Sequence, residues 1–309
     1  MQRDIAVIIC SRGREHYLER LLREIEAGFV PALAAGGLSL STFVYGQNYP
    51  EEFWCRLERL FAPALASGRL VLIRAARPHR RIGDVVAAAI AAVHERADYR
   101  LAMLIDDDSR YRADAASDEN LRDAATTFLA RGDLAYSIKL GTGRALEFWP
   151  FVDPAGPIMP FKEKMLWVAR PVLEEALALP RFAELSIGED AVIAALAWRA
   201  GPQGCLGVFG VAGFVHLGFE PDPEQEPGEI AGGYADLMEA TPGAAEHGKY
   251  DAALRSGVTP YHVLPDIFVG EDHPHYIYNG IRPEAVARHM PDAGPFRRLS
   301  MLPADVPSQ

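Results

Sequence analysis

Cysteine is scarce in this sequence, and its three copies form no binding pattern. Cys10, Cys55 and Cys205 are the three cysteines among 309 residues. They are odd in number, widely spaced and not arranged as a CxxC pair. This argues against a disulfide framework and against a zinc site, so we expect reduced thiols in the core.

The sequence also lacks a long apolar run. No uninterrupted apolar stretch approaches the roughly 18 residues that would cross a bilayer. The opening residues, MQRDIAVIIC, pass directly into a short strand-like run, without the longer apolar core and small-residue cleavage site of a signal peptide. We therefore expect a cytoplasmic protein without a membrane span.

Basic residues are fewer than acidic residues in this sequence. The formal net charge is -11, from 31 Lys and Arg against 42 Asp and Glu. This balance argues against a general nucleic-acid binder and against docking on anionic lipid through bulk charge. A local basic patch remains compatible with the composition.

What the sequence does contain is the alternating pattern of an α/β protein. Hydrophobic residues make up 49% and charged residues 24%, which suits a soluble chain with a sizeable core. Apolar runs predict strands at 5–10, 42–45, 70–73 and 101–105, with amphipathic helical stretches between them. Strands joined by helices at this spacing predict a central, mostly parallel sheet flanked by helices, with right-handed crossovers.

The last of these strands ends on three consecutive carboxylates. Residues 101–105 are apolar without alternation, as in a strand buried on both faces of a sheet, and Asp106, Asp107 and Asp108 follow. Because side chains alternate along a strand, we expect Asp106 and Asp108 to point to one side and Asp107 to the other. At about 5 Å and an effective dielectric of about 20 such a pair repels by about 3 kcal/mol, which a divalent cation would turn into attraction. An acidic, solvated loop is the alternative interpretation.

Other polar groups follow the neighbouring strands. The turn Ser11-Arg12-Gly13-Arg14 leads from the first strand into a helix, and Gln47 and Asn48 follow the second strand. The loop after the third strand, residues 74–81, contains four arginines. Since ligands of open α/β sheets bind at the carboxyl ends of the strands, we expect these groups on the same edge as the aspartates. Guanidinium groups there would suit a diphosphate, although a merely solvated loop fits the pattern equally well.

The second half of the chain contains an acidic helix start and a strand ending in histidine. Residues 186–190, Ser-Ile-Gly-Glu-Asp, precede the helical stretch AVIAALAWRAG at 191–201. Carboxylates there complement the helix dipole, so a simple helix cap worth about 0.5–1 kcal/mol is one interpretation. The apolar stretch 205–215 ends at His216, and a lone histidine in that place is more often structural than a ligand. We also predict a helix at 118–131, strands at 134–139 and 164–170, and a helix at 171–179.

In this order the features resemble those of the GT-A glycosyltransferases, especially the family-2-like group that uses nucleotide-diphospho sugars. The shared set is the N-terminal strand, loop and helix unit, the strand ending in three aspartates, the Gly-Glu-Asp helix start and the strand ending in His216. The resemblance covers about residues 5–216. It implies a GT-A, Rossmann-like fold, a nucleotide-diphospho sugar donor and a hydroxyl-bearing acceptor.

The resemblance also implies roles for individual residues. In the family, the motif that matches Asp106-Asp107-Asp108 holds Mn²⁺ or Mg²⁺ on the diphosphate of the donor, with Asp108 as the direct metal ligand and Asp106 facing the ribose and the metal. His216 matches a histidine that is a third metal contact in many members. Glu189-Asp190 matches the catalytic pair of the acceptor-side helix, in which the aspartate is the base in inverting members.

Two departures from the family pattern affect these assignments. The second strand usually ends in an acidic residue that helps hold the nucleoside, whereas here it ends in VYGQN, so Gln47 or Asn48 would have to substitute. A second Gly-Glu-Asp occurs at 270–272, but HPHY follows it rather than a helix, and we prefer the first. The candidate donor-binding residues are Ser11, Arg12, Gln47, Arg77, Arg81, Asp106 and Asp107.

We divide the chain at residue 219. Residues 1–219 form the predicted glycosyltransferase domain, with a nucleotide-binding half at 1–112 and an acceptor half at 113–219. A stretch rich in Pro and Glu follows, EPDPEQEPGE, which is typical of an exposed linker. Residues 220–309 are therefore assigned to a C-terminal extension, with short helices predicted at 234–238 and 285–289 and an edge strand at 261–269.

Two other functions remain compatible with the sequence. A sugar-phosphate nucleotidyltransferase would share the sheet topology, but it favours a glycine-rich loop around phosphate after the first strand, and SRGRE supplies one glycine. A non-catalytic nucleotide-sugar binding protein would keep the fold and lose the chemistry. Binding without turnover would identify the latter.

Overall fold

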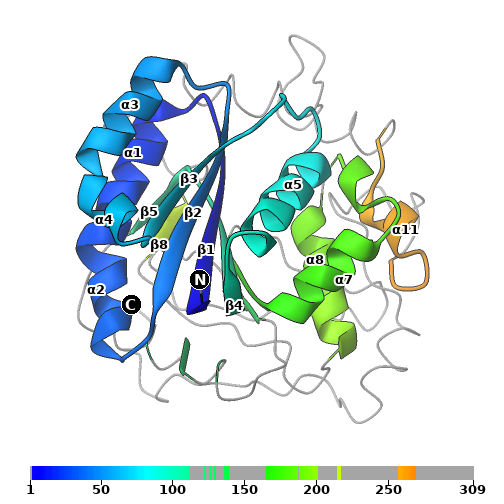
Figure 1. The fold of residues 1–309 in the computed structure, drawn as a ribbon. Helices are drawn as coiled ribbons and strands as arrows, with labels where there is room; N and C mark the ends of the chain where they lie inside the picture. The colour runs from blue at the N-terminus through cyan, green and yellow to red at the C-terminus, as the bar shows by residue number, and fades with distance from the viewer. Residues whose placement is uncertain are drawn as a thin grey trace, which may run out of the picture.

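A six-stranded sheet separates two layers of helices in the described part of the molecule (Figure 1). The computed structural model describes residues 2–111, 122, 125–126, 129, 136–138, 165–186, 188–200, 214–216 and 257–268. Within these residues, the strand β7 (Met165–Ala169) runs antiparallel to its neighbours. The predicted α/β class, with a mostly parallel sheet flanked by helices, is confirmed.

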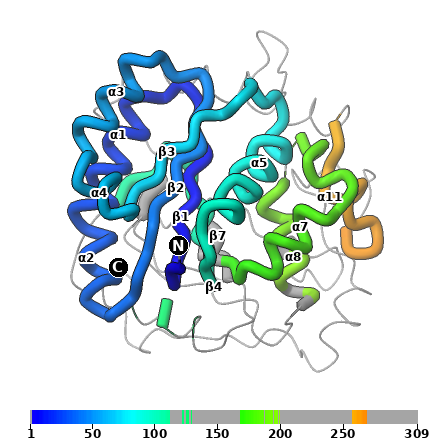
Figure 2. The backbone as a smooth tube through the Cα atoms, viewed as in Figure 1, coloured from blue at the N-terminus to red at the C-terminus, as the bar shows by residue number. Residues whose placement is uncertain are grey.

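The sheet has the strand order β3-β2-β1-β4-β7-β6. β1 lies in its middle and pairs in parallel with β2 on one side and with β4 on the other. β7 lies beside β4 in Figure 2 and pairs with it antiparallel. A separate pair of short strands joins β5 to β8. The strands are β1 (Gln2–Arg12), β2 (Leu40–Gln47), β3 (Leu70–Arg74), β4 (Asp98–Asp106), β5 (Ser109–Tyr111), β6 (Tyr136–Ile138), β7 (Met165–Ala169) and β8 (Phe214–His216).

Each face of the sheet has its own apolar core. Ile5, Val7 and Ile9 of β1 pack toward the first helical layer, while Ala6 and Ile8 of the same strand pack toward the second. This explains why the strand is apolar without alternation. The first layer contains α1 (Glu15–Glu24), the π-helix η1 (Ile25–Phe29), α2 (Val30–Ala35), α3 (Glu51–Leu60) and α4 (Ala62–Ala66). The second contains α5 (Ile82–His94), α7 (Arg170–Ala178), the 3-10 helix η2 (Phe182–Glu184), α8 (Glu189–Ala200) and α11 (Pro260–Val263).

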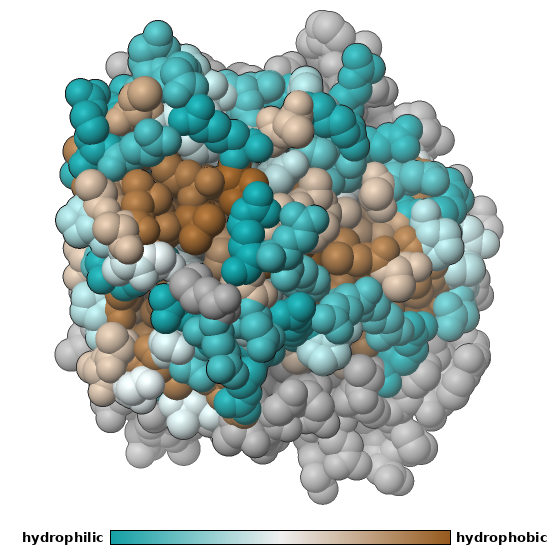
Figure 3. All heavy atoms as spheres, viewed as in Figure 1, coloured by the Kyte–Doolittle hydropathy of each residue, from teal (hydrophilic) through white to brown (hydrophobic). Residues whose placement is uncertain are grey.

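The strand-to-helix connections after β1, β2 and β3 gather at one edge of the sheet, at the top of the view in Figure 1. The described residues along this upper rim are mostly hydrophilic on the face drawn in Figure 3. This edge of the sheet is therefore polar, in contrast to the two apolar cores on either side of the strands.

Most predicted elements that fall within the described residues are confirmed. The strands predicted at 5–10, 42–45, 70–73, 101–105, 134–139 and 164–170 correspond to β1, β2, β3, β4, β6 and β7, and the helices predicted at 171–179 and 191–201 to α7 and α8. Of the predicted strand 205–215, residues 214–215 lie in β8. Most of the predicted helix 118–131 lies outside the described residues, as do residues 205–213, the short helices 234–238 and 285–289, and the second Gly-Glu-Asp at 270–272.

Two expectations were wrong. Residues 261–268, the described part of the predicted edge strand 261–269, do not form that strand. Thr259 caps a short helix, α11, in which Pro260 takes the first position, and the Thr259 backbone N–H donates to His262 Nδ1 at 3.1 Å. Cys55 is not a core thiol but lies exposed on the outer face of α3.

The segment 257–268 belongs to the second core, although it lies beyond the predicted domain boundary at 219. Val258, Leu264, Ile267 and Phe268 are buried in the same apolar cluster as α8. Val258 also forms a β-bridge with Leu185, just before α8. Part of the predicted C-terminal extension therefore supports the helix that carries Glu189 and Asp190.

Among the residues that the structure describes, no helix combines the length and apolar character needed to cross a bilayer.

Gly83 allows α5 to pack directly against η2. A Cβ atom at this position would lie 2.2 Å from the carbonyl oxygen of Phe182 and 2.8 Å from Cβ of Leu185. The Gly83 N–H donates to the Leu185 carbonyl at 3.0 Å. Since this segment leads into α8, the contact helps to set where α8 begins.

We expect Gly83→Ala to lower the free energy of unfolding by about 2 kcal/mol or more, because backbone atoms must move to admit the methyl group. Urea denaturation followed by circular dichroism measures the loss. Gly36→Ala is the control, since its Cβ would come no closer than 3.3 Å to a non-neighbouring atom. Equal losses in both variants would contradict the packing argument.

Candidate functional site

The strand order reverses beside β1, which is where open α/β sheets bind ligands. β2 and β3 extend the sheet on one side of β1, and β4 lies on the other side. In register, Cys10 lies opposite Asp106, and Arg12 lies opposite Gln47. The candidate residues at the ends of β1, β2 and β4 therefore share one edge, as predicted from the parallel sheet.

Asp107 is the buried centre of this edge. Its side chain has no exposed area, and both the Ser11 hydroxyl and the Arg14 guanidinium donate to it. From Nη1, the same guanidinium donates to Oδ2 of Asp108 at 3.1 Å. Arg14 thus bridges two neighbouring carboxylates with one forked side chain, a geometry that lysine does not offer.

Burial raises the pKa of Asp107 to about 6. The Arg14 guanidinium and the Ser11 hydroxyl oppose this rise, whereas the carboxylates of Asp108 and Asp106 add to it. At pH 7 the carboxyl is therefore mostly ionised, and Arg14 is the group that keeps it so. The contacts of Asp107 are thus with the chain itself, at the base of the edge.

The turn after β4 changes which carboxylates converge. Strand alternation predicted that Asp106 and Asp108 would face one side and Asp107 the other. β4 ends at Asp106, however, and residues 107–108 form a turn into β5, so alternation does not extend past the strand end. Asp107 and Asp108 instead share Arg14. The expectation that Asp107 faces away from Asp108 was therefore wrong.

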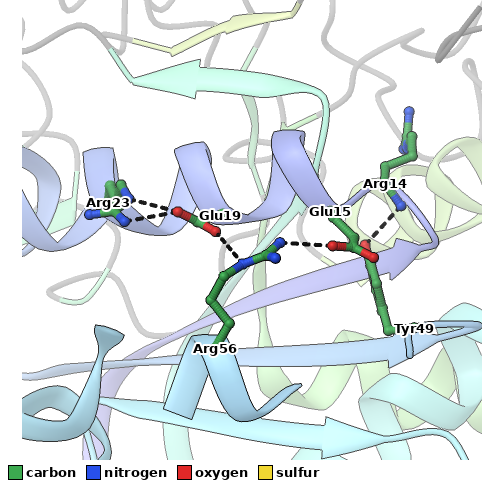
Figure 4. A network of polar contacts seen from close by, with 6 residues as sticks. All are labelled: Arg14, Glu15, Glu19, Arg23, Tyr49 and Arg56. Atoms are coloured by element: carbon green, nitrogen blue, oxygen red, sulfur yellow. Dashed lines mark hydrogen bonds and ion pairs between the residues drawn. The ribbon is translucent and has the colours of Figure 1, made fainter. Parts of the chain in front are cut away.

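Tyr49 holds the turn that carries Ser11 and Arg14. Its hydroxyl is hydrogen-bonded to Ser11 Oγ. The same hydroxyl accepts from the Arg14 backbone N–H at 3.2 Å, as Figure 4 shows. Burial, together with the Asp107 charge, raises the pKa of Tyr49, so the hydroxyl stays protonated. Gly13 completes the turn with a φ of 63°, a conformation that glycine adopts at little cost.

An open cleft of about 630 Å³ lies on the outer side of α1, next to this turn. Arg56 of α3 donates to Glu15 at 2.7 Å and to Glu19 at 3.0 Å, and Arg23 pairs with Glu19 at 2.8 Å. Figure 4 shows that the Arg14 side chain points away from this ladder of surface ion pairs. The cleft is therefore a neighbour of the aspartate network rather than a part of it.

The predicted nucleoside residues at the end of β2 also contact the chain itself. Gln47 is 4% exposed, and its Oε1 accepts the backbone N–H of His79 at 2.7 Å. With its carboxamide oxygen turned toward Arg12, Asn48 accepts from Arg12 Nε at 2.9 Å. Gln47 therefore anchors the basic loop, while its nitrogen donates no hydrogen bond to a described residue.

The basic loop lies over the end of β2 rather than over the aspartates. His79 is buried beside Gln47, and its Nδ1 lies 2.8 Å from Asp84. Arg77 donates to Asp84 at 2.9 Å, while Arg81 is exposed and pairs with no described carboxylate. The loop starts from β3, three strand spacings or roughly 14 Å from β4. The loop and the aspartates therefore flank the edge from opposite sides.

The acidic start of α8 comes close to the end of β1. α8 begins at Glu189, after Gly188 with a φ of 77°, and Asp190 Oδ1 accepts the backbone N–H of the next residue at 2.7 Å. Burial raises the pKa of the Cys10 thiol, and the charges of Asp106 and then Glu189 add to the rise. The charges of Glu189 and Asp106 therefore both act on the Cys10 thiol, which places Glu189 near the ends of β1 and β4.

β8 returns His216 to the end of the aspartate run. In the two-stranded pair of β5 and β8, His216 lies opposite Ser109, the residue after Asp108. Residues far apart in sequence are therefore neighbours along the backbone. Asp106, Asp108 and His216, the three predicted metal contacts, belong to one region of the fold.

The carboxylates suit a cation that binds together with phosphate. Asp106 and Asp108 offer hard oxygen donors, and Mg²⁺ is usually held by one or two carboxylates plus substrate phosphates. Within the described ranges, no group of three or more His, Cys, Asp or Glu side chains is placed to hold a metal ion. Asp106 and Asp108 therefore fit Mn²⁺ or Mg²⁺ only together with oxygen atoms supplied by a phosphate ligand.

Sequence reasoning missed Arg14 and Tyr49, which organise this edge. Both fall in turns, and no local pattern links Arg14 to Asp107 or Tyr49 to Ser11. A signal was present, however. Three consecutive carboxylates at a buried strand end require a counter-ion, and the turn after the adjacent strand contains arginines.

Asp107→Asn is expected to lower the free energy of unfolding by about 2 kcal/mol, because it removes the charge-assisted bond from Arg14 and weakens the bond from Ser11. Thermal and urea unfolding measure the change. Glu19→Gln is the control, since its partners Arg23 and Arg56 are about half exposed and such pairs contribute less than about 1 kcal/mol. A smaller loss for Asp107→Asn than for Glu19→Gln would contradict the buried network.

No protein-family model matches the chain, and no curated protein matches it. Among solved structures, S. aureus TarS 1–349 is similar at 15% identity and a TM-score of 0.47, over 67% of this chain and 58% of that one. Its complex with UDP gives 14% identity and a TM-score of 0.46, over 67% and 57% of the two chains. Its complex with UDP-GlcNAc gives 12% and 0.49, over 82% and 65%. This chain thus spans less than two thirds of the TarS chains, and the likeness is one of fold alone.

Proposed function

We propose that this chain is a glycosyltransferase that moves a sugar from a nucleotide-diphospho sugar to a hydroxyl group of an acceptor. One observation carries the proposal. The run Asp106–Asp108 ends β4 directly beside the end of β1, at the point where the strand order reverses. A ligand bound at such a point lies along the carboxyl ends of the strands.

The two flanks of the edge suit a long, anionic donor. Arg77 and Arg81 lie on the β3 side and the aspartates lie on the β4 side, roughly 14 Å apart across the strands. In this proposal the nucleoside lies over the end of β2, where the Gln47 carboxamide nitrogen can reach it. The diphosphate lies toward β4, beside Ser11 and Arg12.

The start of α8 supplies the acceptor side of the reaction. The acceptor oxygen attacks the anomeric carbon, the bond from that carbon to the diphosphate oxygen breaks, and the nucleoside diphosphate leaves with the bonding electrons. Asp190 takes the proton of the acceptor hydroxyl, since a carboxylate at a helix start is kept ionised by the helix dipole. Glu189 is the second carboxylate of this pair. We propose an inverting transfer, with the base across the sugar from the leaving group.

The proposed reaction also uses a divalent cation. Asp106 and Asp108, with His216 as a third contact, would hold Mn²⁺ or Mg²⁺, which would neutralise charge on the departing diphosphate. The chain's own residues hold the turn after β4 in place, because Arg14 bridges Asp107 and Asp108. Measurements of nucleotide binding test the cation site, and measurements of turnover test the catalytic base.

Binding of nucleoside diphosphates is expected to depend on Mn²⁺ through Asp108. Isothermal titration of the full chain with UDP, GDP, ADP and UDP-GlcNAc, in Mn²⁺ and in EDTA, measures it. Asp108→Asn should remove the metal-dependent part of the affinity, while Glu58→Gln, on the exposed side of α3, should leave it unchanged. Equal affinity in Mn²⁺ and EDTA would contradict the metal site. Failure of every nucleotide to bind would contradict the donor class.

Asp190→Asn should reduce turnover by roughly 10²- to 10⁴-fold with nearly unchanged donor affinity, because the amide keeps the shape but cannot take the proton. Release of nucleoside diphosphate from the donor, with water as acceptor if need be, measures turnover. A helix cap instead predicts a stability loss of about 1 kcal/mol and near-normal turnover. Asp272→Asn, in the second Gly-Glu-Asp, is the control. If it were the inactive variant, the catalytic helix would be misassigned.

A further inference from the structure

Arg14 contacts a carboxylate that a bound cation would also need. Its Nη1 lies 3.1 Å from Oδ2 of Asp108, the proposed direct ligand of Mn²⁺ or Mg²⁺. A guanidinium and a divalent ion a few ångströms apart repel each other strongly. The charge of Arg14 therefore competes with a bound cation at Asp108.

We propose that Arg14 is an exchangeable counter-ion of this site. It neutralises Asp108 while no donor is bound, and it releases Asp108, but not Asp107, when the cation binds with the donor diphosphate. The proposal rests on the proposed function, because it takes Asp108 as a metal ligand. It adds that the chain itself sets its metal affinity, through a residue that is not a ligand.

The two contacts of Arg14 differ in a way that favours exchange at Asp108. Asp107 has no exposed side-chain area and also accepts from Ser11, so loss of Arg14 there would leave a buried charge without its counter-ion. The Asp108 side chain, by contrast, is 9% exposed. Water and ions therefore reach Asp108 more easily than Asp107.

Negative charge gathers around the ends of β1 and β4. The Cys10 thiol lies within the fields of Asp106, Glu189 and Asp107, which act on it in the same direction. Arg14 brings a cation to this acidic region from a backbone position held by the Tyr49 hydroxyl. Its guanidinium also lies 5.9 Å from the ring centre of Tyr17, an aromatic face that remains within reach when the contact with Asp108 is lost.

Mn²⁺ binding to the nucleotide-free chain tests the proposal. Arg14→Gln should raise the affinity for Mn²⁺ by about tenfold or more, as measured by titration calorimetry or by the electron paramagnetic resonance signal of free Mn²⁺. Arg14→Lys keeps the charge and should stay within about threefold of the unaltered chain. Arg23→Gln, an exposed arginine of α1, should have no effect.

A second variant is needed because Arg14→Gln removes the counter-ion of the buried Asp107 carboxylate and so destabilises the fold. The double variant Arg14→Gln/Asp107→Asn removes both charges and keeps Asp106 and Asp108, and it should show the same gain in Mn²⁺ affinity. Unchanged or weaker binding in the folded variants, or no Mn²⁺ binding by any chain, would overturn the proposal. Titrations with nucleoside diphosphates report separately on the donor site. A gain in Mn²⁺ affinity without binding of any nucleotide would overturn the glycosyltransferase assignment alone.

Discussion

The parallel pairing of β1 with both β2 and β4 is the constraint on which the rest of the site depends. A central strand with neighbours on both sides has no freedom to shift, because a slip by one residue would exchange the side chains that face the two cores. Ile5, Val7 and Ile9 are fixed toward one core, and Ala6 and Ile8 toward the other. The ends of β1 and β4 are then held in register, with Cys10 opposite Asp106.

The polar edge built on this register is held together by charge as well as by the sheet. Arg14 and Asp107 link the turn after β1 to the turn after β4, and Tyr49 joins the turn after β2 to the same network. A buried ion pair is costly to desolvate and adds little net stability, but removal of one partner is strongly destabilising. We therefore regard this pair as a device that specifies the geometry of the edge.

The architecture could be predicted from the sequence because each strand is a short apolar run bounded by polar turns, and because the apolar content of β1 and β4 required two covered faces. The grouping of Asp106, Gln47 and the first turn on one edge followed from parallel pairing alone. Two features could not be predicted. The chain turns immediately after Asp106, which cancels strand alternation for Asp107 and Asp108. The hydrogen bond that the His79 backbone N–H donates to Gln47 depends on the path of a loop, which no sequence periodicity indicates.

The short helix α11 was mispredicted for a related reason. Residues 261–269 contain Tyr, Val, Ile and Phe, which favour a strand, but Thr259 and Pro260 form a helix start that overrides this preference. The apolar residues that follow are buried against α8 rather than in a sheet. From the composition, the segment was correctly expected to be buried, but a strand was predicted where the chain forms a short helix.

The burial of 257–268 against α8 has a consequence for how the protein is made. A chain leaves the ribosome from its N-terminus, so β1 to β4 can pair while the later residues are still being synthesised. Part of the apolar surface around α8 is not covered until Leu264, Ile267 and Phe268 have emerged. The nascent chain would therefore complete the helix bearing Asp190 late, and a shortened chain that stops at residue 219 would expose that surface to aggregation.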